Sequence, residues 1–235
     1  MNDSDRTLPT DEEHEARMRE LQAGMHARIA AAREKRDLVI VNTGPGKGKS
    51  TAAFGLLARN LGHNRRSVVI QFVKAGDNAV ARALHGPLLE WHRVGDGFTW
   101  DTQNRSADIA SCRKGWALAC AALQDPDVKF VLLDELNIVL SYNYLPVAEV
   151  IAALKARAPG KHVVITGRGA PEELIAVADL VTEMTEVKHP FKAGVKAQEV
   201  FQHSHVSAQC AGWRTVRQRS QGRDGVLVSV RSIRR

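Results

Sequence analysis

Short strand-like runs, most of them apolar, alternate with helix-like stretches along most of this chain. The runs that predict strands are residues 38–42, 67–73, 88–94, 130–134, 162–166 and 180–187. Between them, helices are expected at about residues 49–61, 107–123, 146–157 and 171–178. Continuous apolar runs, such as Phe130–Leu133, are typical of parallel strands that are covered on both faces. The alternation predicts an α/β fold with a doubly wound, mainly parallel sheet of about six strands.

A charged helix is expected ahead of this alternation. Thr10 and Glu13 form a capping-box pattern, in which a hydroxyl group and the carboxylate three residues later cap the same helix start. The helix runs to about Lys35, and its one narrow apolar stripe consists of Met18, Leu21, Met25 and Ile29. A helix this polar needs a surface to lie on, either its own domain or a partner subunit. We expect residues 1–9 to be disordered.

Length and composition limit the class of protein. The 235 residues are 44% hydrophobic, which is enough chain to bury a core. No apolar run approaches the roughly 20 residues that span a bilayer, and the first residues do not resemble a signal peptide. We therefore expect a soluble, cytoplasmic protein with no membrane partner. Cys112 and Cys120 fall on one predicted helix about 12 Å apart, too far for a disulfide.

The excess positive charge lies at the C-terminal end of the chain. The formal net charge is +7, from 33 basic and 26 acidic side chains. Residues 201–235 hold seven arginines and one acidic residue, Asp224, which leaves 26 basic and 25 acidic side chains in residues 1–200. A basic tail is usually solvated, so this distribution argues against a nucleic-acid partner. We divide the chain into an N-terminal segment (1–36), an α/β domain (37–198) and a poorly ordered basic tail (199–235).

A glycine-rich turn joins the first predicted strand of the domain to its first helix. Residues 43–50 read Thr-Gly-Pro-Gly-Lys-Gly-Lys-Ser and end in the GK[ST] of a Walker A phosphate loop. In such a loop, successive backbone N–H groups and the positive end of the helix dipole face phosphate oxygens. Lys49 is expected to neutralise phosphate charge, and the Ser50 hydroxyl to bind Mg²⁺. The loop is one residue shorter than the consensus, because Thr43 stands at its first glycine position.

A second motif supports nucleotide binding. The apolar run Val131–Leu133 ends in Asp134 and Glu135, an arrangement that places a carboxylate near the metal of a bound nucleotide. Phosphate loops serve hydrolases, kinases and motors alike. The two motifs therefore predict a nucleotide enzyme and leave its reaction open.

Longer stretches of the chain resemble the ATP:corrinoid adenosyltransferases of cobalamin biosynthesis. The most specific is Gly-Phe-Thr-Trp-Asp-Thr-Gln-Asn-Arg at residues 97–105, and the family's phosphate loop has the same shortened form preceded by Thr. The other matching segments follow in the family's order: residues 44–55 with Arg59 and Gly62-His63, 132–136, 144–146, 165–169, 187–189 and 194–198. The resemblance implies a P-loop fold of the RecA-like kind, preceded by the N-terminal helix.

The resemblance implies transfer of the 5′-deoxyadenosyl group of ATP to the Co(I) of a reduced corrinoid, with release of triphosphate. The corrinoid brings its own nucleophile, so the protein positions the substrates and stabilises the charge of triphosphate. In this scheme Lys49 and Glu135 are catalytic, and Ser50 and Glu135 hold Mg²⁺ or Mn²⁺. The residues expected to contact ATP are Gly44, Pro45, Gly46, Lys47, Gly48, Lys49, Ser50, Thr51 and Arg59.

The resemblance gives Phe98 and Trp100 a role towards the corrinoid. These aromatic side chains would displace the lower axial ligand of Co(II) and leave a four-coordinate cobalt that is easier to reduce. Their polar, glycine-flanked loop favours this role over an ordinary pair of core aromatics. The family also implies a homodimer, in which the N-terminal helix covers the active site, and a flavodoxin- or ferredoxin-type electron donor.

The chain departs from the family pattern at three places. Pro45 stands where Asn is common and removes one N–H donor from the loop. Ser50 replaces the usual Thr and keeps the metal-binding hydroxyl. After Gln198 the chain continues for 37 residues, beyond the usual end of the family.

Two other functions remain open on the residues alone. A P-loop phosphotransferase or ATPase would release ADP, and a nucleic-acid module would show salt-sensitive binding through the arginine tail. Residues 90–95 approach the D-x-H-x-x-G pattern of cobalt-ligating proteins, yet we expect His92 to be an ordinary strand residue. His63 and His189 have family counterparts and no role that the residues reveal.

Overall fold

The computed structural model describes residues 10–73, 79–94, 104–196 and 198. The chain divides into two compact units between Thr185 and Glu186. The described part of the second unit contains the 3₁₀ helix η2 (Pro190–Ala193) and an ion pair between Lys192 and Glu186. The first unit holds the sheet and the helices that pack on it.

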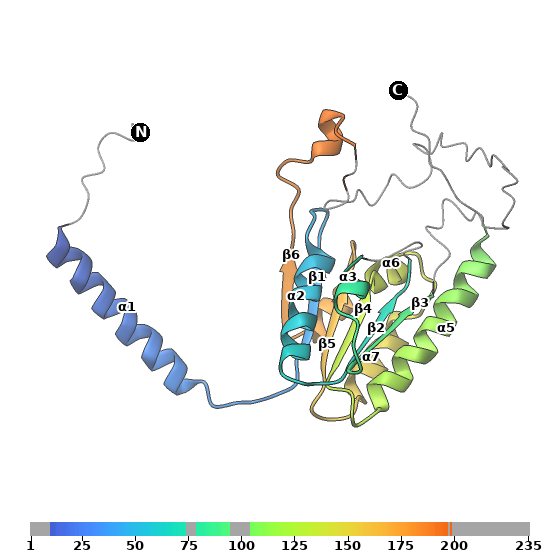
Figure 1. Cartoon of the computed structure of the whole chain (residues 1–235), viewed down its shortest axis with the longest axis horizontal. Helices are drawn as coiled ribbons and strands as arrows, with labels where there is room; N and C mark the ends of the chain where they lie inside the picture. The colour runs from blue at the N-terminus through green and yellow to red at the C-terminus, as the bar shows by residue number, and fades with distance from the viewer. Residues whose placement is uncertain (1–9, 74–78, 95–103, 197, 199–235) are drawn as a thin grey trace, which may run out of the picture. The chain divides into compact units, whose positions relative to one another are not determined.

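The first unit is built on a six-stranded sheet in which every strand pairing is parallel. The strand order is β3-β2-β4-β5-β1-β6, as Figure 1 shows. The strands are β1 (Val39–Thr43), β2 (Ser67–Gln71), β3 (Leu89–Arg93), β4 (Phe130–Asp134), β5 (His162–Thr166) and β6 (Leu180–Glu183). This confirms the predicted doubly wound α/β fold and all six predicted strands.

Helices connect the strands and cover both faces of the sheet. In chain order the helices are α1 (Asp11–Ala31), α2 (Lys49–Gly62), α3 (Ala79–Ala83), α5 (Arg105–Gln124), α6 (Leu136–Ser141), α7 (Val147–Lys155) and α8 (Glu172–Val177). The predicted helices at 49–61, 107–123, 146–157 and 171–178 are therefore confirmed within a few residues. Helices α3 and α6 have no counterpart in the sequence prediction.

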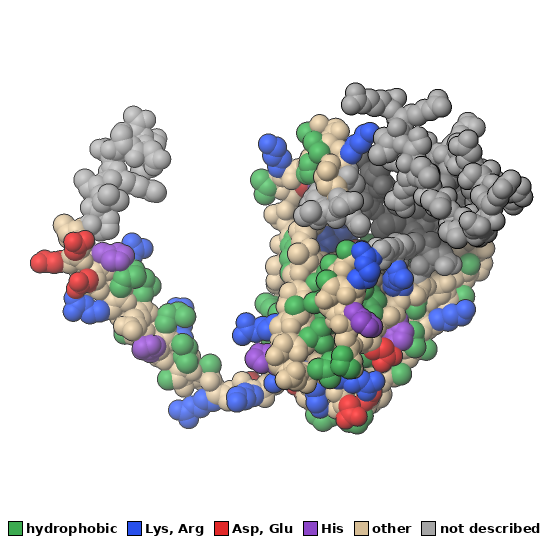
Figure 2. Space-filling view, in the orientation of Figure 1, with side chains coloured by type: hydrophobic (Ala, Val, Ile, Leu, Met, Phe, Trp, Pro, Cys, Tyr) green, Lys and Arg blue, Asp and Glu red, His purple; other side chains and the backbone are tan. Residues whose placement is uncertain are grey.

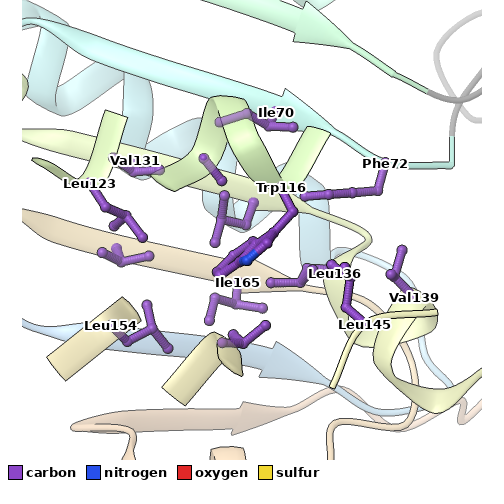
Figure 3. Close-up of a cluster of buried hydrophobic side chains, with 14 of the residues drawn as sticks. Ile70, Phe72, Trp116, Leu123, Val131, Leu136, Val139, Leu145, Leu154 and Ile165 are labelled. Atoms are coloured by element: carbon purple, nitrogen blue, oxygen red, sulfur yellow. The ribbon is translucent and has the colours of Figure 1, made fainter. Parts of the chain in front are cut away.

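Successive residues of the four central strands, β1, β2, β4 and β5, point to opposite faces of the sheet and contribute to two separate cores. On one face, the strand side chains of Ile40, Val69, Leu132 and Val164 pack against Ala53 and Leu57 of α2. On the other face, a larger core holds side chains from α5, α6, α7 and α8. Figure 3 shows Trp116 of α5 at the centre of this core, beside Leu136 and Ile165.

Helix α1 begins as predicted and has no buried residue. Both capping-box hydrogen bonds between Thr10 and Glu13 are present, at 2.9 and 3.3 Å. The helix ends at Ala31, four residues before the predicted Lys35. The apolar stripe predicted on α1 is exposed, and Figure 2 shows acidic, basic and apolar side chains mixed along the helix.

Several expectations concern features outside the sheet. Among the described residues, no helix is both long and apolar enough to cross a membrane. Cys112 and Cys120 share helix α5 and are free thiols, as expected. The predictions for residues 1–9 and for the basic tail after residue 198 lie outside the described residues.

Candidate nucleotide site

The predicted phosphate loop lies between β1 and α2 at the carboxyl edge of the sheet. Gly48 is the residue before the first turn of α2, and its left-handed backbone (φ 105°) turns the chain into the helix. No side chain caps this helix start. The first backbone N–H groups of a 14-residue helix are therefore directed toward the position where a phosphate would bind.

Met184, directly after β6, holds the loop through two backbone hydrogen bonds. The Gly46 N–H donates to the Met184 carbonyl at 2.6 Å, and the Met184 N–H donates to the Thr43 carbonyl at 2.9 Å. Gly44 has a left-handed backbone (φ 94°), and a Cβ atom at this position would lie 2.5 Å from the Met184 oxygen. Only glycine fits at position 44, because a side chain would collide with the backbone that holds the loop.

Lys49 places its charge inside the loop. The side chain is buried, and its ammonium donates to the carbonyl oxygen of Gly44 at 2.8 Å and to that of Gly46. A buried ammonium requires acceptors or a counter-charge, and here the loop's own carbonyl oxygens serve. The geometry places a cation where the negative charge of a phosphate is expected.

A row of buried polar side chains crosses the sheet beside the loop. Asn42, Gln71, Asp134 and Thr166 stand near the carboxyl ends of β1, β2, β4 and β5, all on the α2 side. The backbone register pairs Gln71 with Asp134 and Asn42 with Thr166. We call these four residues the polar row.

Hydrogen bonds join the polar row to its surroundings. The Gln71 amide donates to Asp134 Oδ2 at 2.8 Å, and the Thr166 hydroxyl donates to Asp134 Oδ1 at 2.7 Å. At the other end of the row, the Asn42 amide donates to the carbonyl oxygen of Lys49 at 3.2 Å and so holds the first turn of α2. Sequence reasoning did not name Asn42, Gln71 or Thr166, although each ends an apolar run.

Glu135 is held by its backbone at the edge of the sheet. Its φ of 64° is left-handed, a conformation that costs a non-glycine residue roughly 1–3 kcal/mol. The Glu135 N–H donates to the Thr166 hydroxyl at 3.0 Å, and the residue is largely buried. Strained residues of this kind collect at functional sites, and the metal-binding role of Glu135 stays a prediction.

A further buried amide lies next to this edge. Asn137 of α6 is fully buried, and its amide donates to the Gly167 carbonyl at 3.0 Å. In the described part of the chain, its Oδ1 accepts no hydrogen bond. This hydrogen bond ties α6 to the turn after β5. The Gly167 backbone also lies close to Asn137.

The oxygen donors at this edge fit Mg²⁺. Ser50 supplies a hydroxyl in the first turn of α2, and Glu135 supplies a carboxylate. Mg²⁺ prefers oxygen ligands and is usually bound by one or two carboxylates together with substrate phosphates. Within the described ranges, no group of three or more His, Cys, Asp or Glu side chains could hold a metal ion. The hydroxyl and the carboxylate are of the kind that binds Mg²⁺ together with substrate phosphates.

The structure does not bring every predicted residue to the loop. Arg59 lies in the last turn of α2 and is exposed. Ten residues of helix place it about 15 Å from Lys49 along the axis, farther than an arginine side chain reaches. Pro45 and Thr51 are exposed at the loop, and Lys47 is half-buried there. Phe98 and Trp100 lie outside the described residues.

The histidines singled out in the sequence lie in three different parts of the structure. His92 lies on β3, as expected, and its Nε2 is 2.7 Å from Glu90 Oε1. His63 follows α2 as its C-terminal cap residue, and its backbone N–H donates to carbonyl groups of the last turn. His189 belongs to the second unit, directly before η2.

Comparison with known proteins gives a consistent result. Residues 35–202 match the family described as ATP:corrinoid adenosyltransferase BtuR/CobO/CobP. The chain is 46% identical over 192 residues to a corrinoid adenosyltransferase of Pseudomonas aeruginosa, covering 80% of this chain and 95% of that protein. It is 45% identical over 190 residues to corrinoid adenosyltransferase CobA of Salmonella typhimurium, covering 80% and 97%. A corrinoid adenosyltransferase of Escherichia coli K12 is 44% identical, with the same coverage.

The matched residues include the phosphate loop, the polar row and Glu135, so the similarity covers the site as well as the sheet. The identities extend over nearly the full length of the relatives. The chain belongs to the ATP:corrinoid adenosyltransferase family and is a transferase.

Proposed function

We propose that this enzyme transfers the 5′-deoxyadenosyl group of ATP to the Co(I) of a reduced corrinoid and releases triphosphate. The observation that carries the proposal is the Lys49 ammonium inside a loop that opens onto the first turn of α2. This arrangement suits a polyphosphate, and membership of the adenosyltransferase family supplies the second substrate. The reaction serves adenosylcobalamin biosynthesis or corrinoid salvage.

The reaction requires no nucleophile from the protein. The electron pair of Co(I) forms a bond to C5′ of ATP, and the C5′–O bond breaks with its electrons on the triphosphate oxygen. Because the cobalt is the nucleophile, the protein need not supply one. Lys49 and the N–H groups at the start of α2 stabilise the charge that develops on the leaving triphosphate.

We further propose that Ser50 and Glu135 hold Mg²⁺, or Mn²⁺ in its place, when ATP binds. The metal supplies positive charge to the triphosphate oxygens. The Ser50 hydroxyl and the Glu135 carboxylate orient it, and the left-handed backbone of Glu135 restricts where that carboxylate stands. Support comes from the oxygen donor set described above.

For Phe98 and Trp100 we keep the role implied by the family resemblance, which is displacement of the lower axial ligand of Co(II). The test is the double variant Phe98→Ala with Trp100→Ala. It should retain most turnover of pre-reduced Co(I) corrinoid and lose turnover that requires enzymatic reduction. Equal losses in the two assays would contradict the role.

The proposal also includes a homodimer, in which the N-terminal helix covers the corrinoid, and a flavodoxin- or ferredoxin-type electron donor. The exposed apolar stripe of α1 supports a covering role, because it is available to a partner surface. Deletion of residues 1–36 should impair corrinoid use more than ATP binding. Unchanged kinetics would refute this part of the proposal.

The decisive experiment is anaerobic incubation with Mg-ATP and chemically reduced cobalamin. Loss of Co(I) absorbance, formation of light-sensitive adenosylcobalamin and release of triphosphate are expected. Formation of ADP with Co(I) unconsumed would instead support the phosphotransferase or ATPase. The phosphate product distinguishes the two, because only adenosyl transfer leaves all three phosphates joined.

A further inference from the structure

Trp91 of β3 joins two parts of the nucleotide site. Its indole N–H donates to Gln71 Oε1 at 2.9 Å. Its ring packs against Phe54 of α2, with the ring centroids 5.4 Å apart. Phe54 lies four residues after Ser50, on the same side of α2. One side chain thus touches both the helix that carries Ser50 and the polar row.

The indole determines which way the Gln71 amide points. An indole N–H is a donor only, so the amide oxygen of Gln71 must face Trp91. The amide nitrogen must then face Asp134, where it donates to Oδ2 at 2.8 Å. The Asp134 carboxylate accepts only, so both partners require the same orientation of this amide, and without Trp91 the amide oxygen loses its indole donor.

A second set of hydrogen bonds reaches Asp134 from the opposite side. The Glu135 N–H donates to the Thr166 hydroxyl at 3.0 Å, and this hydroxyl donates to Asp134 Oδ1 at 2.7 Å. The Thr166 hydroxyl has a single hydrogen, which it gives to Asp134, so its lone pairs are left for the Glu135 N–H. Two chains of donors therefore converge on the Asp134 carboxylate.

We infer that Trp91 and Gln71 are positioning residues for the metal-binding carboxylate of Glu135. They orient the Asp134 carboxylate, which holds the Thr166 hydroxyl and so retains the left-handed backbone of Glu135. The contact with Phe54 relates this carboxylate to the helix that carries Ser50, the second proposed ligand. The inference rests on the metal site of the proposed function and deepens it.

The hydrogen-bonded chain that leads from Trp91 to Glu135 is largely buried, and burial strengthens it. Gln71, Asp134 and Thr166 are each no more than 1% exposed, and Trp91 is half-buried. Hydrogen bonds away from water are stronger, and a partner lost from such a network is not replaced by solvent. Residues that orient metal ligands from outside the coordination shell change metal affinity by about 10–100-fold when mutated.

The test measures ATP affinity by calorimetry with and without Mg²⁺, using the full chain. The ratio of the two affinities is here called the metal-linked gain. It separates the contribution of the metal from that of the nucleotide alone. Gln71→Leu keeps a side chain of similar size and removes the amide, and we expect it to lower the metal-linked gain about tenfold or more. The affinity for ATP without metal should change little, because Lys49 and the loop are untouched.

Trp91→Phe provides a second variant that keeps an aromatic ring against Phe54. It loses the indole N–H and part of the bicyclic ring, while Gln71 keeps its hydrogen bond to Asp134. The metal-linked gain should therefore fall by less than in Gln71→Leu. Combining the two substitutions should lower the gain no further than Gln71→Leu alone, because both act through one hydrogen-bonded chain. An additive loss in the double variant would overturn the inferred chain.

Val68→Ala is the matched control for general destabilisation. Val68 is a buried residue of the same strand, and its side chain lies on the opposite face from Gln71. This variant should melt at a lower temperature and keep the wild-type metal-linked gain. A wild-type gain in Gln71→Leu, or an equal loss in Val68→Ala, would overturn the inference. Neither result affects the triphosphate assay of the wild-type enzyme, so the two proposals fail separately.

Discussion

The Lys49 ammonium donates a 2.8 Å hydrogen bond to the carbonyl oxygen of Gly44, five residues earlier in the chain. A second hydrogen bond joins the same ammonium to the Gly46 carbonyl. The loop thus folds around its own cation. A triphosphate that enters the loop offers charged oxygens in place of these carbonyl groups, and charge-assisted hydrogen bonds are the stronger ones.

Replacing Lys49 by Met should remove this cation and keep the length of the side chain. Because the charge faces the leaving triphosphate, we expect turnover to fall by about 10²–10³-fold. The matched control is Lys155→Met, an exposed lysine in the last turn of α7, which should leave turnover nearly unchanged. Steady-state kinetics of adenosyl transfer measures both, and similar losses in the two variants would argue against the assigned role.

Thr166 should tolerate Ser better than Val, although Val has the closer shape. Thr166→Val leaves the Glu135 N–H without its acceptor and removes a donor from Asp134, so unfolding should require about 1–3 kcal/mol less free energy. Thr166→Ser keeps the hydroxyl and loses one methyl group, a cost of about 1 kcal/mol. Urea unfolding gives both values. A Val variant as stable as the Ser variant would show that the hydroxyl is dispensable.

Two glycine-to-alanine substitutions should change stability in opposite directions. At Gly167, φ is 130° and a Cβ atom would lie 2.9 Å from Asn137 Cβ, so Gly167→Ala should destabilise the protein by about 1–3 kcal/mol. At Gly55 in the middle of α2, a Cβ atom meets nothing within 4 Å. Gly55→Ala should therefore stabilise the protein by about 0.5–1 kcal/mol. Chemical denaturation of the two variants beside the wild type decides both signs.

The Cys112 thiol should make stability depend on pH in the alkaline range. Burial, reinforced by the nearby Asp108 carboxylate, raises the pKa of this thiol from 9.0 to about 11. Folding therefore favours the neutral thiol, and its contribution is present below about pH 9 and lost as the pH rises toward 11. We expect the unfolding free energy of the wild type to fall more steeply over this range than that of Cys112→Ala. Parallel curves would contradict the shifted pKa.

Much of the sheet was predictable, because its four central strands, β1, β2, β4 and β5, each contain three consecutive apolar residues. The end of β6 was not. The predicted strand extends to residue 187, yet β6 stops at Glu183, opposite Thr43. A strand requires a neighbour, and β1 turns into the phosphate loop after Thr43. Helices α3 and α6 were missed because five or six residues show little of a helical period. Helix α8 is equally short, but Pro171 and the two acidic residues after it mark its start in the sequence.

The place of the loop in the fold was also predictable, because Walker A residues are contiguous in the chain. Lys49 and Ser50 need only a strand before them and a helix after them, and both are present. Arg59 shows the limit of this reasoning. Its position in the chain is close to the loop, and the rise of α2 carries it away.

Four tetrapeptides separate what the sequence determined from what the tertiary structure decided. Val-Ile-Val-Asn, Val-Val-Ile-Gln, Val-Leu-Leu-Asp and Val-Val-Ile-Thr begin at residues 39, 68, 131 and 163, and each is three apolar residues followed by a polar one. The sequence by itself determined that four strands end in a polar side chain. Only the tertiary structure decided that these side chains stand side by side, because strand order and register join segments up to 124 positions apart. Hydrogen bonds between neighbouring strands are the physical cause, and no local pattern contains them.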